Sequence, residues 1–304
     1  MKRTWLVPAL FAALLLCSCQ AAPKAPADPE APRVEGAGPC RLCAEEETAV
    51  PLPETESILF ARCDGETLWE ILLVRDALQG FRAALPELRG HQQEGWSPPE
   101  EPWPVYALSV SGTESDYQAV CCDGVWLDNL GHTLISGPDP APLWERFGET
   151  AREKAAPSYF PAQRELSLAG GGWDARFLVP APCREAEPEI PMTLTEQDGA
   201  LSWEVENRTE QTLICGGSGS AALAVRLGNI WYEVPALSGA HCCYTMEGIP
   251  VRPGGAHAGS LWREPYGALP NGTYRVCLSW HAEDGACGTA AAPFRLQNGV
   301  CVPL

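Results

Sequence analysis

The residues whose types and spacing could carry chemistry are mainly the fourteen cysteines and five histidines of the chain. Cys40 and Cys43 have the C-x-x-C spacing of a redox pair, in which a helix N-terminus lowers the pKa of the first thiol. His241, Cys242 and Cys243 are consecutive and form one compact group that could bind a soft metal ion. A thiol-redox or metal-handling function of these residues is therefore one hypothesis for the chain.

The surroundings of Cys40 and Cys43 favour a structural disulfide over a redox pair. Pro39 precedes the pair, no strand-like run comes before it, and the acidic residues Glu45 to Glu47 follow it. Pro39 and these acidic residues argue against stabilisation of a thiolate, because a reactive cysteine needs an electropositive setting.

Two pairs of adjacent cysteines, Cys121-Cys122 and Cys242-Cys243, also favour structural roles. Neighbouring side chains on a strand point to opposite faces, so we expect one cysteine of each pair to be buried and the other bridged. The sequence has no HExxH or H-x-H pattern, and the Gly216 to Ser220 run fails the last position of a G-x-S-x-G elbow. The sequence therefore predicts no catalytic residue, no metal site and no cofactor.

The first twenty residues indicate where the chain is sent. Two basic residues precede an apolar run from Trp5 to Leu16, which is too short to span a bilayer and fits an export signal. The following Leu16-Cys17-Ser18-Cys19 resembles the lipobox of bacterial lipoproteins, with Cys19 as the acylated residue. This resemblance implies a signal peptide at residues 1–18 and a lipid on Cys19 that holds the protein to the extracytoplasmic face of the cell membrane. An ordinary secretory signal with incidental cysteines is the alternative.

Residues 19–56 are predicted to be a disordered tether. Residues 21–32 alternate Ala, Pro and charged residues, a composition that cannot bury apolar surface and favours extended conformers. Ordered structure is expected to begin near Ser57.

The chain is strongly acidic, with a formal net charge of -18. No basic field exists to neutralise phosphates, which excludes nucleic acid as a partner. Anionic headgroups would repel the folded part, so the predicted membrane contact is the lipid on Cys19.

Disulfides are the expected state of cysteines outside the cytoplasm. Loss of Cys17 with the signal peptide and acylation of Cys19 leave twelve of the fourteen cysteines. The order of residues along the chain suggests Cys40 with Cys43, Cys63 with Cys121 or Cys122, and Cys277, Cys287 or Cys301 with Cys215, Cys242 or Cys243. Cys183 has no obvious partner.

Residues 57–156 are predicted to form a small α+β domain of unknown function. Strand-like runs flank the Asp64-Gly65 turn, and Leu78, Phe81 and Leu85 make one apolar stripe of a helix. Alternating segments from Val105 onward indicate an antiparallel meander, which residues 141–156 close with a helix. The Pro- and Gly-rich residues 157–189 are interpreted as a linker, with an extra strand pair around Leu166 and Phe177 as an alternative.

Residues 190–304 change to an all-β pattern. Short runs of Val, Leu, Thr and aromatic residues are separated at intervals of about 8–12 residues by Asn, Gly and Pro, which is typical of a β-sandwich. Alternation after the Asn271-Gly272 turn points Tyr274 and Val276 one way, and Thr273 and Arg275 the other. Trp203, Trp231 and Tyr274 are the core candidates.

Part of this segment, residues 190–297, resembles a bacterial immunoglobulin-like domain family that is common in exported lipoproteins. The matching features are a Trp-containing hairpin (GNIWYEVP), a proline-glycine turn (VRPGG) and the L-P-N-G-T-Y-R run from Leu269 to Arg275. The resemblance implies an immunoglobulin-like sandwich at a surface location, and it carries no catalytic residues.

Together these patterns predict a membrane-anchored, extracytoplasmic lipoprotein that is not an enzyme. Its immunoglobulin-like domain is expected to serve as a spacer or as a module that binds a protein partner at the cell surface. The alternative is an extracytoplasmic thiol-redox or metal-handling protein that uses Cys40 and Cys43, or His241, Cys242 and Cys243.

Overall fold

The computed structural model describes residues 46–111, 116–154, 159–182, 187–197, 200–217, 220–237 and 248–304. Residues 45–304 form one compact unit, and most of its regular structure is antiparallel β-sheet. The predicted signal peptide, the predicted acylation site Cys19 and most of the predicted tether lie outside the described residues. Among the described helices, none is both long and apolar enough to cross a membrane.

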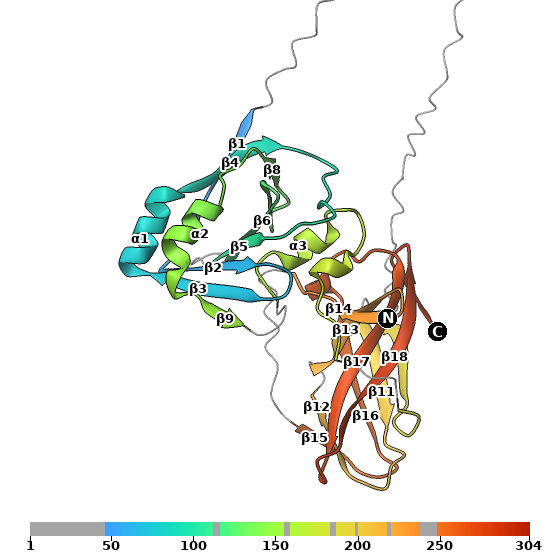
Figure 1. Ribbon diagram of the computed structural model, residues 1–304. Helices are drawn as coiled ribbons and strands as arrows, with labels where there is room; N and C mark the ends of the chain where they lie inside the picture. The colour runs from blue at the N-terminus through green and yellow to red at the C-terminus, as the bar shows by residue number, and fades with distance from the viewer. Residues whose placement is uncertain are drawn as a thin grey trace, which may run out of the picture. The chain divides into compact units, whose positions relative to one another are not determined.

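A nine-stranded antiparallel sheet occupies the first part of the described chain (Figure 1). Its strand order is β1-β4-β8-β7-β6-β5-β2-β3-β9. The strands are β1 (Glu47–Pro51), β2 (Ser57–Cys63), β3 (Leu68–Val74), β4 (Glu87–Gln92), β5 (Val105–Ser111), β6 (Asp116–Cys122), β7 (Val125–Asp128), β8 (Thr133–Ile135) and β9 (Arg152–Lys154). The predicted β2–β3 hairpin and the meander from β5 to β8 are confirmed.

One face of this sheet packs against two helices, α1 (Arg75–Ala84) and α2 (Ala141–Phe147), which lie next to each other in Figure 1. Alternation along β2 turns Phe60 toward these helices. Its ring lies 5.2 Å from that of Phe81 on α1 and 5.3 Å from that of Trp144 on α2, centroid to centroid. The predicted closing helix is shorter than expected, because the chain turns at residues 148–150 and pairs with β3 as strand β9.

The opposite face of the sheet carries a second apolar cluster that contains Ala61, the next residue after Phe60. It is covered by the short helix α3 (Gln163–Leu168) and the 3-10 turn η2 (Ala175–Phe177). Phe160, Leu166 and Phe177 are buried there, although they lie in the segment interpreted as a linker. Part of this segment therefore belongs to the core, and the alternative of a strand pair around Leu166 and Phe177 is wrong, because these residues lie in α3 and η2.

Strand β1 lies inside the range that the sequence assigns to the tether. It pairs with β4 in register from Glu47–His91 to Pro51–Glu87. Val50 and Leu52 are buried, so this stretch of chain is held in an extended conformation at the edge of the sheet. Ordered structure therefore begins before Ser57.

The second part of the described chain is a β-sandwich (Figure 1). One sheet has the order β10-β11-β16 and the other has the order β14-β13-β17-β12-β15, with β18 on β17 and β19 on β18. The strands are β10 (Met192–Gln197), β11 (Ala200–Glu206), β12 (Leu213–Gly216), β13 (Ala222–Leu227), β14 (Ile230–Glu233), β15 (Gly248–Val251), β16 (Ala256–Trp262), β17 (Gly272–Ala282), β18 (Cys287–Gln297) and β19 (Val300–Pro303).

The sandwich core is organised around β17, as the predicted alternation indicates. Tyr274 and Val276 are buried in the core, and Trp203 from β11 is 2 % exposed. Arg275 points to the other face, where its guanidinium carbon lies 4.3 Å from the ring centroid of Trp231. Trp203 and Tyr274 are thus confirmed as core residues, whereas Trp231 is half-buried beside a smaller cluster.

Candidate functional site

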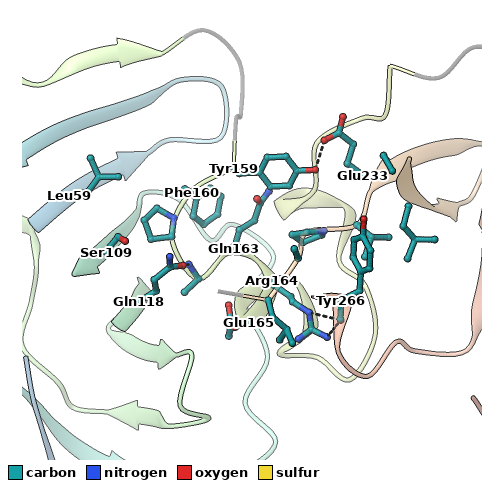
Figure 2. A pocket seen from close by; sticks show the side chains of 18 residues that line it. Leu59, Ser109, Gln118, Tyr159, Phe160, Gln163, Arg164, Glu165, Glu233 and Tyr266 are labelled. Carbon is teal, nitrogen blue, oxygen red and sulfur yellow. Dashed lines mark hydrogen bonds between the residues drawn. The ribbon is translucent and has the colours of Figure 1, made fainter. Parts of the chain in front are cut away.

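A cavity of about 490 Å³ surrounds residues 159–165, in the volume range of sites for small ligands (Figure 2). On one side it is lined by residues of the nine-stranded sheet, and on the other by residues of the sandwich. The lining residues are Leu59, Ser109, Gln118, Tyr159, Phe160, Pro161, Ala162, Gln163, Arg164, Glu165, Ala222, Leu223, Glu233, Val234, Pro235, Ala236, Leu237 and Tyr266.

The backbone before α3 is fixed by an unusual conformation at Ala162. This residue has φ 55°, in the left-handed region that non-glycine residues rarely adopt. Its N–H donates to Oε1 of Gln118 on β6 at 3.2 Å. The turn therefore starts α3 at a defined position over the sheet, and the next residues point toward the cavity.

Gln163 is almost fully buried, with 3 % of its surface exposed. Its Nε2 donates to the carbonyl oxygen of Phe177 at 2.6 Å, but its Oε1 has no hydrogen-bond partner among the described residues. Buried polar atoms are usually paired, so this orphan acceptor distinguishes the cavity.

Arg164 ties α3 to the sandwich. Its Nε and Nη2 donate to the carbonyl oxygen of Tyr266 at 3.2 and 2.8 Å, and Nη2 also donates to Ala268 at 2.8 Å. Burial lowers the pKa of the guanidinium, which stays protonated because its ordinary pKa is so high. These donors therefore hold backbone carbonyls and are not available to a ligand.

Tyr159 and Glu233 form the second tie across the cavity (Figure 2). The Tyr159 hydroxyl donates to Oε2 of Glu233. Burial around this hydroxyl and its bond to the carboxylate raise the pKa of Tyr159, although 48 % of the residue is exposed. Tyr159 is thus a neutral donor with an accessible ring.

Glu165 is a titratable group of the cavity whose pKa is shifted by its surroundings. Burial raises the pKa of its carboxyl, and the negative charge of Asp128 adds to this effect, while a backbone hydrogen bond and Arg164 oppose it. The carboxyl is half-buried and therefore incompletely solvated.

This raised pKa predicts a pH-dependent stability difference between the protein and Glu165→Gln. An acid with a higher pKa in the folded state favours folding less as the pH rises from its unfolded-state pKa to its folded-state pKa. We expect the variant to gain melting temperature relative to the parent as the pH rises from about 4 to 7, the range that begins near the ordinary Glu pKa. Thermal unfolding of both proteins at several pH values measures this difference, and a constant gap would contradict it.

A second polar cluster lies nearby, around the buried Asp128 at the end of β7. Its Oδ1 accepts from the N–H groups of Leu130 and His132 at 3.0 and 2.8 Å. Its Oδ2 accepts from the Tyr117 hydroxyl at 3.1 Å and lies 2.7 Å from Nδ1 of His132. The carboxylate thus holds the β7–β8 turn, and this aspartate–histidine contact has a structural explanation.

None of the sequence-predicted site residues that the structure describes lines this cavity. Residues outside the described part of the chain are Cys19, Cys40, Cys43, Cys183, His241, Cys242 and Cys243. Cys121 and Cys122 point to opposite faces of the nine-stranded sheet, as expected for neighbours on a strand, but both are buried. The expectation that one of this pair is bridged is wrong, because both are free thiols.

The predicted disulfide of Cys63 with Cys121 or Cys122 is also absent. Val105 lies between Cys63 and Cys122 and pairs with both, so the two cysteines are separated by two strand spacings of about 4.8 Å. Their Cα atoms are therefore farther apart than the roughly 7 Å that a disulfide allows. Cys121 faces the other side of the sheet from Cys63.

The predicted partners of Cys215 within the described residues do not pair with it either, because Cys215, Cys287 and Cys301 are free thiols. Cys215 pairs in register with Trp280 and lies in the sandwich core, whereas Cys277, three residues from Trp280, packs on the opposite face. Cys287 and Cys301 lie on β18 and β19, away from β12. Pairings with Cys242 or Cys243 stay predictions.

Four of the described cysteines are in environments that suppress the reactivity of their thiols. Burial raises the pKa of Cys121 and Cys122 to about 12. It raises the pKa of Cys215 and Cys301 to about 11, with Glu196 adding to the effect at Cys301. Since the thiolate is the nucleophile, these cysteines behave as apolar packing residues.

Sequence reasoning missed every charged residue of the cavity, because residues 157–189 were interpreted as a linker. One signal was present: Phe160, Leu166 and Phe177 are large apolar residues in a Pro- and Gly-rich stretch. Such residues need a surface to pack against, and here they seal α3 and η2 onto the sheet.

No protein-family model and no curated protein matches this chain. By its fold, the chain is a predominantly antiparallel β protein that contains a β-sandwich. Its candidate site is the cavity at residues 159–165.

Proposed function

We propose that the protein is a membrane-anchored lipoprotein on the extracytoplasmic face, which binds a partner and is not an enzyme. In this proposal residues 57–156 act as an α+β domain, and residues 190–304 act as an immunoglobulin-like domain that serves as a spacer or a protein-binding module. Lipid on Cys19 is the membrane contact, and the tether gives the folded part its reach.

The observation that carries the binding role is the arrangement of the cavity. Arg164 is occupied by the backbone carbonyls of Tyr266 and Ala268, and Tyr159 is occupied by Glu233. These ties hold the lining in place, which reduces the ordering cost of binding. The remaining groups include the Gln163 Oε1 acceptor and the faces of Tyr159 and Tyr266, which suit recognition of a ligand.

The buried cysteines of the described residues are not candidates for a thiol-redox function. Buried cysteines with raised pKa values are poor nucleophiles, and the described cysteines include Cys121, Cys122 and Cys215 in this state. The alternative redox or metal function depends on Cys40 and Cys43, or on His241, Cys242 and Cys243.

The proposed lipid anchor predicts opposite results for serine substitutions at Cys19 and Cys17. Cys19→Ser should abolish lipid incorporation and move the protein from the membrane to the soluble fraction, because the acylated atom is removed. Cys17→Ser, which changes the same atom type two residues earlier, should leave lipid and membrane association unchanged. Metabolic labelling with a fatty-acid analogue and detergent phase partition measure both effects.

The opposite pattern would change the assignment. Loss of lipid in Cys17→Ser with retention in Cys19→Ser would move the acylation site to Cys17. Absence of lipid in the parent protein would overturn the anchored lipoprotein and leave the ordinary secretory signal.

A further inference from the structure

We infer that the cavity at residues 159–165 binds a small organic ammonium ion, held by the Gln163 carbonyl, the Glu165 and Glu233 carboxylates and the rings of Tyr159 and Tyr266. This inference rests on the proposed binding role and names the ligand class of that site. The cavity volume of about 490 Å³ accommodates a ligand of this size.

Gln163 has unused hydrogen-bonding capacity. The amide is held from one side by its bond to Phe177, which fixes the direction of the other end. Figure 2 shows this side chain extending from α3 toward the ring of Tyr159. The orphan Oε1 is an acceptor only, so the group that satisfies it must bring a hydrogen on nitrogen or oxygen.

The charged side chains that line the cavity favour a cationic ligand. Among the described residues that line the cavity, the carboxylates are Glu165 and Glu233, and Arg164 is the cation. Arg164 directs its Nε and Nη2 donors at Tyr266 and Ala268, whereas the Oε1 atom of Glu233 is not used by Tyr159. With both carboxylates ionised, two negative charges stand against one guanidinium and the lining has a net negative charge. Hydrogen bonds from a cation to a carboxylate are the stronger class.

Two tyrosine rings in the lining also favour a cation. The ring of Tyr159 is half exposed, and Tyr266 is half-buried on the sandwich side of the cavity. The hydroxyl of Tyr159 is fixed on Glu233, so the ring is held in place while its face remains accessible. Aromatic faces attract cations, most strongly when the cation is partly desolvated. An anion would meet two carboxylates here, and a neutral ligand would leave their charge unused.

The test uses the full-length lipoprotein in detergent micelles, with diaminobutane as the ammonium probe. Calorimetric titration should show saturable binding of diaminobutane, weaker binding of tetramethylammonium, which lacks N–H donors, and no binding of the isosteric butanediol. In the protein labelled with nitrogen-15, the side-chain amide signals of Gln163 should shift during the diaminobutane titration. Equal binding of butanediol, or no binding of diaminobutane, would overturn the inference.

Two charge-matched variants locate the site. Glu165→Gln keeps the shape of the side chain and should weaken diaminobutane binding about tenfold or more, because it removes a charged acceptor. Glu153→Gln makes the same charge change at an exposed position of β9 and should bind within about twofold of the parent, the effect of a distant screened charge. Equal losses in both variants would show general charge attraction and would contradict a built site.

The outcomes separate this inference from the proposed function. If the protein carries lipid on Cys19 and is folded but does not bind diaminobutane, the ammonium site is wrong and the anchored binding protein stands. If the protein lacks lipid but binds diaminobutane through Glu165, the anchor is wrong and the site stands.

Discussion

Replacing Trp203 with alanine should lower the free energy of unfolding by about 3–5 kcal/mol, the range for removing a large aromatic side chain from a packed core. Trp203 is 2 % exposed on β11 and lies in the main cluster of the sandwich. Its ring meets that of His257 edge to face, with centroids 5.1 Å apart. Alanine leaves a cavity that the surrounding strands cannot fill without losing their register. Chemical denaturation, followed by near-ultraviolet circular dichroism, measures the loss.

Trp203→Phe is the matched control for this prediction. The indole Nε1 of Trp203 has no hydrogen-bond partner among the described residues, so phenylalanine removes an unsatisfied donor together with part of the ring. We expect Trp203→Phe to cost less than half as much as Trp203→Ala. Equal losses in the two variants, or a loss below about 1 kcal/mol in Trp203→Ala, would contradict a packed position for this side chain.

Replacing Phe60 with alanine should cause a similar loss, again about 3–5 kcal/mol. Phe60 is fully buried on β2 and contacts Phe81 and Trp144 at centroid distances of 5.2 and 5.3 Å. Its removal takes away the ring that joins α1 and α2 to the nine-stranded sheet. Chemical denaturation followed by circular dichroism is expected to show an earlier transition.

The control for Phe60→Ala is Leu72→Ala on the neighbouring strand β3, where the side chain is 60 % exposed. Exposed substitutions of this kind change stability by about 0.5 kcal/mol or less. If Leu72→Ala destabilises the protein as much as Phe60→Ala does, the assignment of the two faces of the sheet is wrong.

The two core substitutions also test the predicted domain boundaries. Phe60 and Trp203 belong to separate apolar clusters within one compact unit. If residues 57–156 and 190–304 fold as separate domains, each substitution should lower one unfolding transition and leave the other in place. A single transition that shifts in both variants would contradict that division.

The parts of the fold that sequence reasoning predicted are those with local causes. The strand-like apolar run at residues 57–63 and the helical stripe of Leu78, Phe81 and Leu85 depend on neighbours in the chain, and both elements form as expected. The alternation of Tyr274 and Arg275 along β17 is predicted for the same reason.

The parts that were missed depend on contacts between distant segments. Strand β1 is stabilised by pairing with β4, and α3 by a sheet face whose position no local pattern shows. The disulfide pairings were inferred from order along the chain, whereas strand register decides which thiols can meet. Cys63 and Cys122 are kept apart by the intervening Val105.

The cavity could not be predicted from sequence for the same physical reason. Arg164 and Tyr266 are about a hundred residues apart in the chain and meet only in the folded protein. The orphan acceptor of Gln163 is a property of its burial, and Gln163 in isolation carries no sign of it.

The most direct measurement is the intact mass of the protein extracted from membranes, combined with fragment sequencing of its N-terminus. A tethered lipoprotein predicts a mature chain that begins at Cys19 and carries a lipid adduct on that residue. A soluble product without lipid, with an N-terminus elsewhere and a reactive Cys40–Cys43 or Cys242–Cys243 pair, would contradict the anchored binding protein and favour thiol chemistry.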